Sequence, residues 1–194
     1  DVNLGRLETG DSGVGLYMES QNDIDSLTSI KTGENSIAVY SKNGDIDTKK
    51  LDSAKFLLGK GSTGYFLENG TLKSTAGSSN LVLGNDVTGV ALTGNSAIEN
   101  TINSISIGNN TGSASGIKPI VLGIKEVSSP QTLTTTLTGG DGTVGLYYQE
   151  EGTGNSVSYN GGGSITTPDI KTGIAGGNLS SVGVYLKADT AVNA

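Results

Sequence analysis

The sequence predicts an all-β chain folded as a parallel β-solenoid, with coils of about 20–26 residues. Two observations lead to this fold class. A short phrase recurs along the chain, and within it apolar residues alternate with other types at the two-residue period of a β-strand. Helical patterns are nearly missing from the 194 residues, and only the stretch 48–58 is compatible with a short helical turn.

The repeated phrase has six recognisable copies. They read VGLYM at 14–18, IAVYS at 37–41, TGYFL at 63–67, TGVAL at 88–92, VGLYY at 144–148 and VGVYL at 182–186. The central residues of the first four copies lie 23, 26 and 25 positions apart. A unit of this length holds two or three short strands and cannot bury its own apolar face, so such units stack strand on strand.

Alternation within the phrase assigns two faces to each strand. The first, third and fifth residues are expected to face the core, and they are mostly Val, Leu and Ile. The second and fourth residues are expected to face solvent, the second being small and the fourth usually aromatic. The aromatic residues at the fourth place are Tyr17, Tyr40, Phe66, Tyr147 and Tyr185.

These five aromatic residues are the candidate ligand contacts. If the coils stack in register, some of their rings form a ladder along one outer face. The rings then either stabilise the sheet by covering neighbouring glycines, or they form a stacking platform for sugar rings or a protein partner. Both interpretations stay open from the sequence alone.

The chain is predicted to be one β-helical unit with three regions. Regular coils with aromatic residues occupy 1–73, aromatic-free coils rich in Ser, Thr and Asn occupy 74–140, and coils with an insertion occupy 141–194. The insertion, at about 149–181, is the best candidate for a binding protrusion, because loops absorb extra length more easily than strands do. The Thr-rich tract 128–140 lacks a regular Thr-x-Thr array and is expected to be an extended loop or edge segment.

Composition excludes several kinds of partner and site. The net charge is −7 with a single arginine, so the basic surface typical of nucleic-acid binding is missing, and contact with an anionic membrane is equally unsupported. The chain has no cysteine and no histidine, which excludes disulfides and thiolate or imidazole metal sites. No apolar run is long enough to span a bilayer, and no signal peptide is recognisable, so a mature chain or an excised piece is expected. We expect no metal and no cofactor.

No catalytic residues are predicted, and the chain is not expected to be an enzyme. The glycine-rich stretch 10–15 lacks the Lys-Ser/Thr of a phosphate-binding loop and is expected to belong to a strand. The pairs Asp23/Asp25 and Asp45/Asp47 could bind Ca²⁺ or act as acid and base. They lack further acidic ligands and an Arg/Lys cluster, which favours turn carboxylates. A β-helical polysaccharide lyase or hydrolase stays as the enzymatic alternative.

The phrases x-V-G-L-Y, S-I-A-V-Y-S-K-N-G and S-V-G-V-Y-L-K resemble repeats in the passenger regions of large fusobacterial outer-membrane autotransporter adhesins (type V secretion, RadD-type). The resemblance covers residues 10–70 and 140–190 and is weaker between 74 and 140. It implies a right-handed parallel β-helix displayed on the bacterial surface. It also implies continuity with a longer passenger and a C-terminal outer-membrane barrel outside this chain.

The resemblance further implies adhesion, through a host-cell glycan or protein receptor or the surface of other bacteria, and it supplies no catalytic residues. A purely structural stalk segment is an alternative function. A trimeric autotransporter head is an alternative fold, with coils of about 14–16 residues. The spacing of Val90, Ile105 and Ile120 fits that shorter coil.

Overall fold

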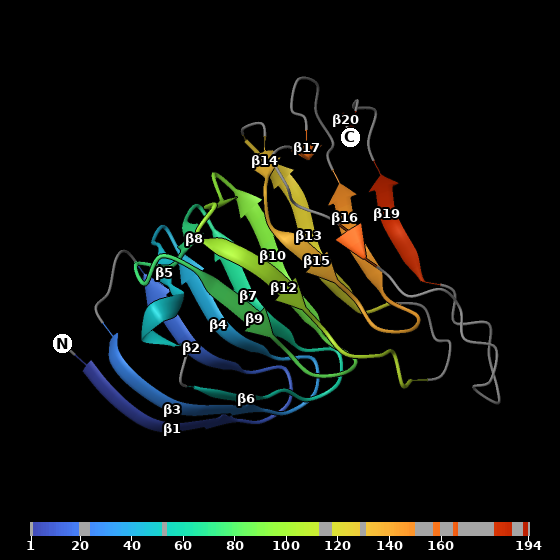
Figure 1. Cartoon of the computed structure of the whole chain (residues 1–194). Helices are drawn as coiled ribbons and strands as arrows, with labels where there is room; N and C mark the ends of the chain where they lie inside the picture. The colour runs from blue at the N-terminus through green and yellow to red at the C-terminus, as the bar shows by residue number, and fades with distance from the viewer. Residues whose placement is uncertain are drawn as a thin grey trace.

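The described part of the computed structural model comprises residues 2–19, 24–51, 54–112, 118–128, 131–149, 157–159, 165–166, 181–187 and 192–193. It consists of strands and one 3₁₀ turn, η1 (Thr48–Lys50). All strand pairs in this part of the chain are parallel. The strands stack along one axis into a β-solenoid (Figure 1), which confirms the predicted fold class.

A seven-stranded sheet, called here the long sheet, runs the whole length of the solenoid (Figure 1). Its strands lie in chain order: β2 (Val14–Glu19), β4 (Ile37–Lys42), β7 (Thr63–Glu68), β10 (Thr88–Gly94), β13 (Ile120–Val127), β16 (Val144–Gln149) and β19 (Val182–Lys187). All six repeated phrases lie in this sheet. Strand β13 is a further copy that the aromatic pattern did not reveal.

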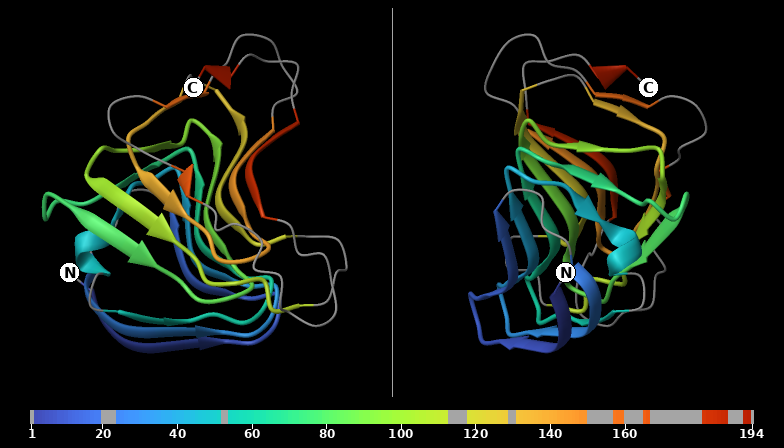
Figure 2. Two further views of the ribbon diagram at one scale, coloured as in Figure 1. Left: turned by 45° about the vertical axis from the view of Figure 1, so that its right-hand side comes forward. Right: turned by 90° about the vertical axis from the view of Figure 1, so that its left-hand side faces the viewer.

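Shorter sheets close the solenoid on its other sides (Figure 2). One contains β1 (Val2–Thr9), β3 (Ile24–Thr32) and β6 (Lys55–Leu57), and a second contains β5 (Ile46–Asp47), β8 (Thr71–Lys73) and β11 (Ala97–Ile98). A third contains β9 (Ser79–Val82), β12 (Ile102–Ser106), β15 (Thr136–Thr138) and β18 (Ile165–Thr166). The last contains β14 (Gln131–Leu133), β17 (Val157–Tyr159) and β20 (Val192–Asn193).

One apolar core fills the space between these sheets. The long sheet supplies Val90 and Leu122, and the sheet of β9, β12, β15 and β18 supplies Ile105 and Leu137, all without exposed surface. Because identical coil positions stack directly on one another, each buried side chain contacts its counterparts in the coils before and after it. The core is therefore a continuous stack and not a set of separate clusters.

Asparagine residues make the bends between strands. Asn43 and Asn69 have φ angles of 59° and 61°, in the left-handed region that asparagine tolerates. The Asn69 side-chain amide donates to Asn43 Oδ1 at 3.0 Å, and Asn69 Oδ1 accepts from the backbone N–H of Asn95 at 2.9 Å. The turns at 42–44 and 68–70 are thus joined to each other from coil to coil.

The second residue of the phrase faces the core, so its predicted solvent-facing position is wrong. A Cβ atom on Gly89 would lie 3.0 Å from Ile105 Cγ2 and 2.5 Å from the backbone oxygen of Val121. Ala38, at the equivalent place, is fully buried. In the strand register, the first residues of neighbouring phrases pair with each other, and so do the third residues, whereas the second residues are not paired. Strict alternation therefore breaks at this point, and the second and third residues both point inward.

The first residue of the phrase is less buried than predicted in most copies, although Val144 is buried as predicted. Val14, which we expected inside, has 41% of its surface exposed, and Ile37 is half-buried. The third and fifth residues behave as predicted in the inner strands, where Val90 and Leu92 are buried. The alternation holds from the third residue to the end of the phrase.

Two further expectations from the sequence are corrected. Val90 and Ile120 lie in the long sheet, whereas Ile105 lies in β12 on the other side of the core. Their 15-residue spacing therefore alternates between two sheets and is not a coil length. The Thr-rich tract forms strands β14 and β15, of which β14 is an edge strand and β15 lies inside its sheet. Most of the predicted insertion at 149–181 lies outside the described residues.

Candidate functional site

The five predicted aromatic residues come together on the outer face of the long sheet. The fourth residues of successive phrases pair in register, Tyr17 with Tyr40 and Tyr40 with Phe66 at one end. At the other end Tyr147 pairs with Tyr185. We call these five side chains the aromatic column, and their alignment follows directly from parallel stacking without any shift in register.

Ring geometry divides the aromatic column into two blocks. Tyr17 and Tyr40 pack edge to face with centroids 5.1 Å apart, and Tyr40 and Phe66 do the same at 5.0 Å. Tyr147 and Tyr185 stack face to face, with centroids 5.3 Å apart and planes 5° from parallel. Both arrangements are favourable for aromatic pairs. Some of the rings therefore form a ladder, as predicted, in two separate blocks.

Small residues separate the two blocks. Ala91 pairs with Phe66 on one side and with Gly123 on the other, and Gly123 in turn pairs with Tyr147. At the usual strand spacing of about 4.8 Å, the backbones of Phe66 and Tyr147 lie about 14 Å apart. A Cβ atom on Gly123 would have no neighbour nearer than 3.9 Å. The outer surface between the blocks therefore carries little side-chain bulk.

Polar side chains accept hydrogen bonds from two of the phenolic hydroxyls, while the rings stay on the outer face of the sheet. The Tyr40 hydroxyl donates to Glu68 Oε2, and Lys42 Nζ lies 3.8 Å from the other oxygen of the same carboxylate. The Tyr147 hydroxyl donates to Gln149 Oε1 at 2.7 Å. The hydrogen bond to the Glu68 carboxylate, helped by burial, raises the pKa of Tyr40 to about 12. This hydroxyl is accordingly protonated at physiological pH.

The carboxylate pair Asp45/Asp47 is occupied by contacts to the next coil. Asp45 accepts hydrogen bonds from Lys73 Nζ at 2.6 Å and from the backbone N–H of Thr71 at 3.0 Å. Asp47 accepts from the backbone N–H groups of Thr75 and Lys49, each at 3.0 Å. Apart from the contact with Lys49, which lies in the same turn as Asp47, these hydrogen bonds join one coil to the next.

The remaining candidates for a metal or acid–base site are Asp23 and Asp25, and any other cluster of acidic side chains. Asp23 and the side chain of Asp25 lie outside the described residues. Within the described ranges, no group of three or more His, Cys, Asp or Glu side chains is placed to hold a metal ion.

Three hydrogen-bonded carboxylates make stability dependent on acid pH. Partial burial alone would raise the pKa of Asp45, Asp47 and Asp86. Hydrogen bonds from the side chains of Lys73, Thr75 and Thr111, respectively, and from nearby backbone N–H groups lower the pKa in each case. A lowered folded-state pKa contributes stability above the unfolded pKa of about 3.9, and that stability is lost as pH falls through the folded value.

We therefore expect the urea midpoint to be steady from pH 7 to pH 5 and to fall below about pH 4. Circular dichroism at each pH measures this dependence. The triple variant Asp45→Asn, Asp47→Asn and Asp86→Asn is less stable at pH 7 and loses less stability on acidification. An equal acid-induced loss in both proteins would contradict the role given to these three groups.

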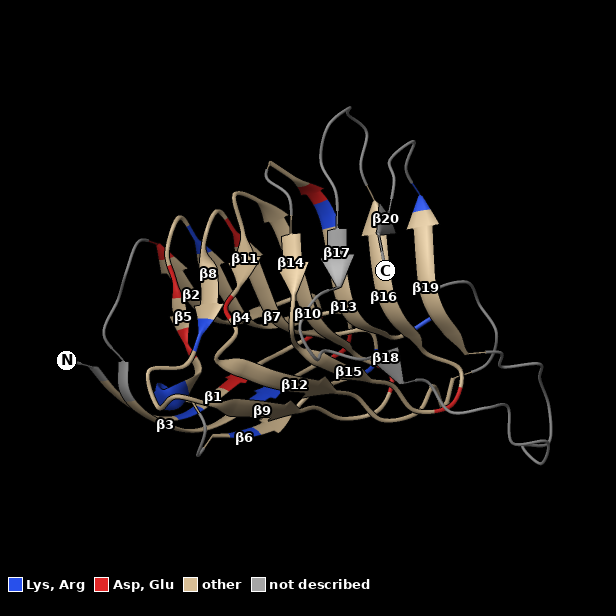
Figure 3. Ribbon diagram, turned by 45° about the horizontal axis from the view of Figure 1, so that its top comes forward, with Lys and Arg blue, Asp and Glu red and all other residues tan. Residues whose placement is uncertain are grey.

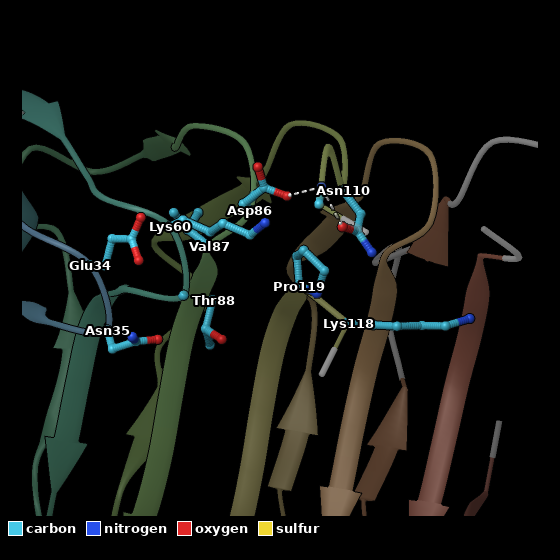
Figure 4. A pocket seen from close by; sticks show the side chains of 11 residues that line it. Glu34, Asn35, Lys60, Asp86, Val87, Thr88, Asn110, Lys118 and Pro119 are labelled. Carbon is cyan, nitrogen blue, oxygen red and sulfur yellow. Dashed lines mark hydrogen bonds between the residues drawn. The ribbon is translucent and has the colours of Figure 1, made fainter. Parts of the chain in front are cut away.

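A pocket of about 270 Å³ lies at the turns that precede β4, β7, β10 and β13 (Figure 4). Asp86, one of its acidic residues, already accepts hydrogen bonds from the backbone N–H groups of Thr111 at 2.6 Å and Gly112 at 3.2 Å. Lys60 extends toward Asp86, whereas Lys118 points away from both (Figure 4). The polar groups do not converge on one ligand, so the pocket is a weaker candidate than the aromatic column.

Together these features define a parallel β-solenoid with an outward aromatic column. Comparison with family models, with curated protein sequences and with solved structures finds no match to the chain. None of the described residues forms a helix with the length and apolar character needed to cross a membrane. The resemblance to autotransporter adhesins therefore stays a prediction.

Proposed function

We propose that the chain is a rod-like segment of a surface-displayed adhesin, in which the aromatic column contacts sugars or proteins on other cells. The observation that carries this proposal is the alignment of five aromatic side chains on one outer face of a parallel solenoid. Tyr40, Phe66 and Tyr147 lie on inner strands of the sheet, and each is still only half-buried. Within each block, a surface of this kind offers ring faces and edges at regular spacing.

The chemistry of such a surface suits weak, repeated contacts. Aromatic rings pack well against the apolar faces of sugar rings and against apolar protein side chains. Each contact is weak, but a stiff scaffold that holds several of them allows simultaneous engagement with a cell surface. The proposed setting is the bacterial cell surface. The proposed partner is a host-cell glycan or protein receptor, or the surface of another bacterium, without a cofactor and without catalysis.

A purely structural stalk is the second candidate function. It is favoured by the edge-to-face contacts of Tyr40 with Tyr17 and Phe66, which stabilise the sheet whether or not a ligand binds. The two functions differ in what the loss of rings changes. A binding surface loses affinity, whereas a stalk loses only stability.

The double variant Tyr17→Ser and Tyr40→Ser tests the proposal. On a glycan array and in whole-cell binding, we expect the unaltered chain to bind and the double variant to lose at least about tenfold in affinity. Thermal unfolding shows how much of this loss comes from weaker folding. Val82→Ser is the matched control, because Val82 is an apolar side chain with 76% exposure on β9, away from the column.

Three other results would contradict the proposal. Binding by neither protein, with a lower melting temperature in the double variant, would support the stalk. Equal loss of binding in Val82→Ser would remove the aromatic column as the contact surface. Cleavage of an array glycan would support the enzymatic alternative.

A further inference from the structure

Strand pairing is interrupted at one place between two successive coils. In the part of the chain that the structure describes, β6 pairs only with β3, and β9 pairs only with β12. The two strands occupy the same place in their coils, because Leu57 and Val82 each lie six residues before the next repeated phrase. Strand β9 nevertheless runs apart from β6 in Figures 1 and 3. We call this break in pairing, between Lys55–Leu57 and Ser79–Val82, the seam.

Glycines in the turns after these strands show where coil stacking stops. A Cβ atom on Gly59 would lie 2.2 Å from the backbone oxygen of Gly33, so the turns after β3 and β6 stack closely. Gly84 is the equivalent residue after β9, and an added Cβ there would have no neighbour within 4 Å. Stacking resumes at Gly61, whose N–H donates to the backbone oxygen of Asp86 at 2.8 Å. The seam is therefore a local break inside the solenoid.

Strand β9 directs unpaired backbone groups toward the seam. The N–H of Leu83, directly after β9, donates to the backbone oxygen of Ser106 in β12 at 2.9 Å. In a parallel strand, successive residues direct their backbone groups to opposite neighbours. The N–H and C=O groups of Asn80 and Val82 are thus directed away from β12, where no strand among the described residues pairs with them. An extended backbone is the partner that matches such an edge.

Exposed apolar side chains flank the seam. Val82 has 76% of its surface exposed and Leu57 has 44%. Between residues 18 and 149, no other large apolar side chain that the structure describes is exposed. On the core side, Phe56 is half-buried and Leu81 is 5% exposed. A strand added at the seam can therefore bury apolar side chains on its outer face as well as on its inner face.

Charge at the seam indicates which strand would fit. Lys55 is exposed, lies two residues before Leu57 on the same face of β6, and forms no ion pair with the described residues. Asn80 is its equivalent on β9 and is also exposed. Neither β6 nor β9 contains a carboxylate. An acidic residue two positions before an apolar residue therefore complements the seam, since opposite charges across neighbouring strands are stabilising.

We propose that the seam binds an extended peptide segment of a partner protein, which adds a strand to the free edge of β9. In parallel orientation, an acidic residue of this segment lies near Lys55 and Asn80. An apolar residue two positions later lies near Leu57 and Val82, and the residue between them points inward beside Leu81. The seam is separate from the aromatic column, and this binding does not depend on the proposed adhesive function.

Fluorescence anisotropy with the labelled peptide Gly-Thr-Glu-Ile-Val-Thr-Gly tests strand addition. Val82→Pro removes an N–H that is directed toward the seam and not toward β12, and proline is tolerated at such a position of an edge strand. We expect this variant to bind the peptide at least about tenfold more weakly. Val82→Thr is the matched control, because threonine keeps the backbone N–H and a branched side chain, and we expect a change below about threefold.

Reversal of charge provides a second, independent test. We expect Lys55→Glu to bind this peptide about fivefold more weakly, and to bind the same peptide with Lys in place of Glu more tightly by a similar factor. Lys125→Glu is the control, because its side chain is 57% exposed on β13, away from the seam. It leaves the affinity for both peptides unchanged.

Melting curves show whether each variant is folded, and if Val82→Pro is not, the charge reversal decides. No binding of the Glu peptide by the unaltered chain up to about 1 mM would overturn the proposal. Equal binding of a peptide with Pro in place of Ile would also overturn it, as would an unchanged peptide preference in Lys55→Glu. Loss of peptide binding in the Tyr17→Ser and Tyr40→Ser double variant would instead place the peptide on the aromatic column.

Discussion

Gly89→Leu is expected to lower the free energy of unfolding by about 3 kcal/mol, whereas Gly123→Leu is expected to change it by less than about 0.5 kcal/mol. The two glycines lie in adjacent strands of the long sheet but on opposite faces. A Cβ on Gly89 meets the Val121 backbone oxygen and Ile105 at 2.5 and 3.0 Å. Backbone and core atoms cannot move aside easily, so a leucine there overpacks the core.

At Gly123 the nearest atoms to an added Cβ are 3.9 Å away, which is an ordinary contact distance. Urea unfolding of both variants, followed by circular dichroism, gives the comparison. A similar loss of stability in both would contradict the assignment of the second phrase residue to the core and the fourth to the outer face.

Leu67→Ala is expected to lower the free energy of unfolding by about 3 to 4 kcal/mol. Leu67 is the fifth residue of its phrase and has no exposed surface. Truncation removes buried methyl groups and leaves a cavity between stacked coils, which relax only partly because each is held by the coils on both sides.

Leu57→Ala provides the matched control, because Leu57 is 44% exposed on β6. We expect this second change to cost less than about 1 kcal/mol, since the side chain already contacts water. Denaturant unfolding of the two variants measures the difference. Equal losses would mean that Leu67 does not lie in a close-packed core.

The fold class and the coil spacing could be predicted because the phrase is repeated with little change. Parallel stacking places equal residues beside equal residues, so one periodic pattern in the sequence fixes both the strand and its partner. The same logic predicted the aromatic column, because the fourth residue of one phrase must lie beside the fourth residue of the next. Turns with Asn43 and Asn69 were predictable from the tolerance of asparagine for positive φ.

Other features depend on contacts that a local pattern does not contain. Whether Gly15 and Gly89 face inward is decided by how closely the neighbouring coil and the opposite sheet approach, and a simple two-residue alternation places them outside. Strand β13 was missed because its fourth residue is Gly123, which carries no ring. The interruption of the aromatic column was visible in the sequence, because residues 74–140 contain no aromatic residue and the phrase at 88–92 has Ala91 in its fourth place.

The polar contacts of the site were also beyond the sequence. The bond from Tyr40 to Glu68 joins residues 28 positions apart, and its partners meet only when the coils stack. The Asp45/Asp47 pair looked like free turn carboxylates, yet both accept hydrogen bonds from the following coil. Parallel stacking therefore uses these carboxylates for cohesion between coils.

In-register parallel stacking of the phrases underlies both the column and the core, and it can be measured directly by pulsed electron–electron double resonance between two spin labels. The chain has no cysteine, so labels attach only where cysteines are introduced. Labels at Lys42 and Lys125 lie three strands apart and labels at Lys42 and Lys187 five strands apart, or about 14 and about 24 Å by strand spacing. With labelled protein diluted in unlabelled protein, we expect the second distance to exceed the first by about 10 Å. Equal distances, or a shorter second distance, would contradict the parallel solenoid.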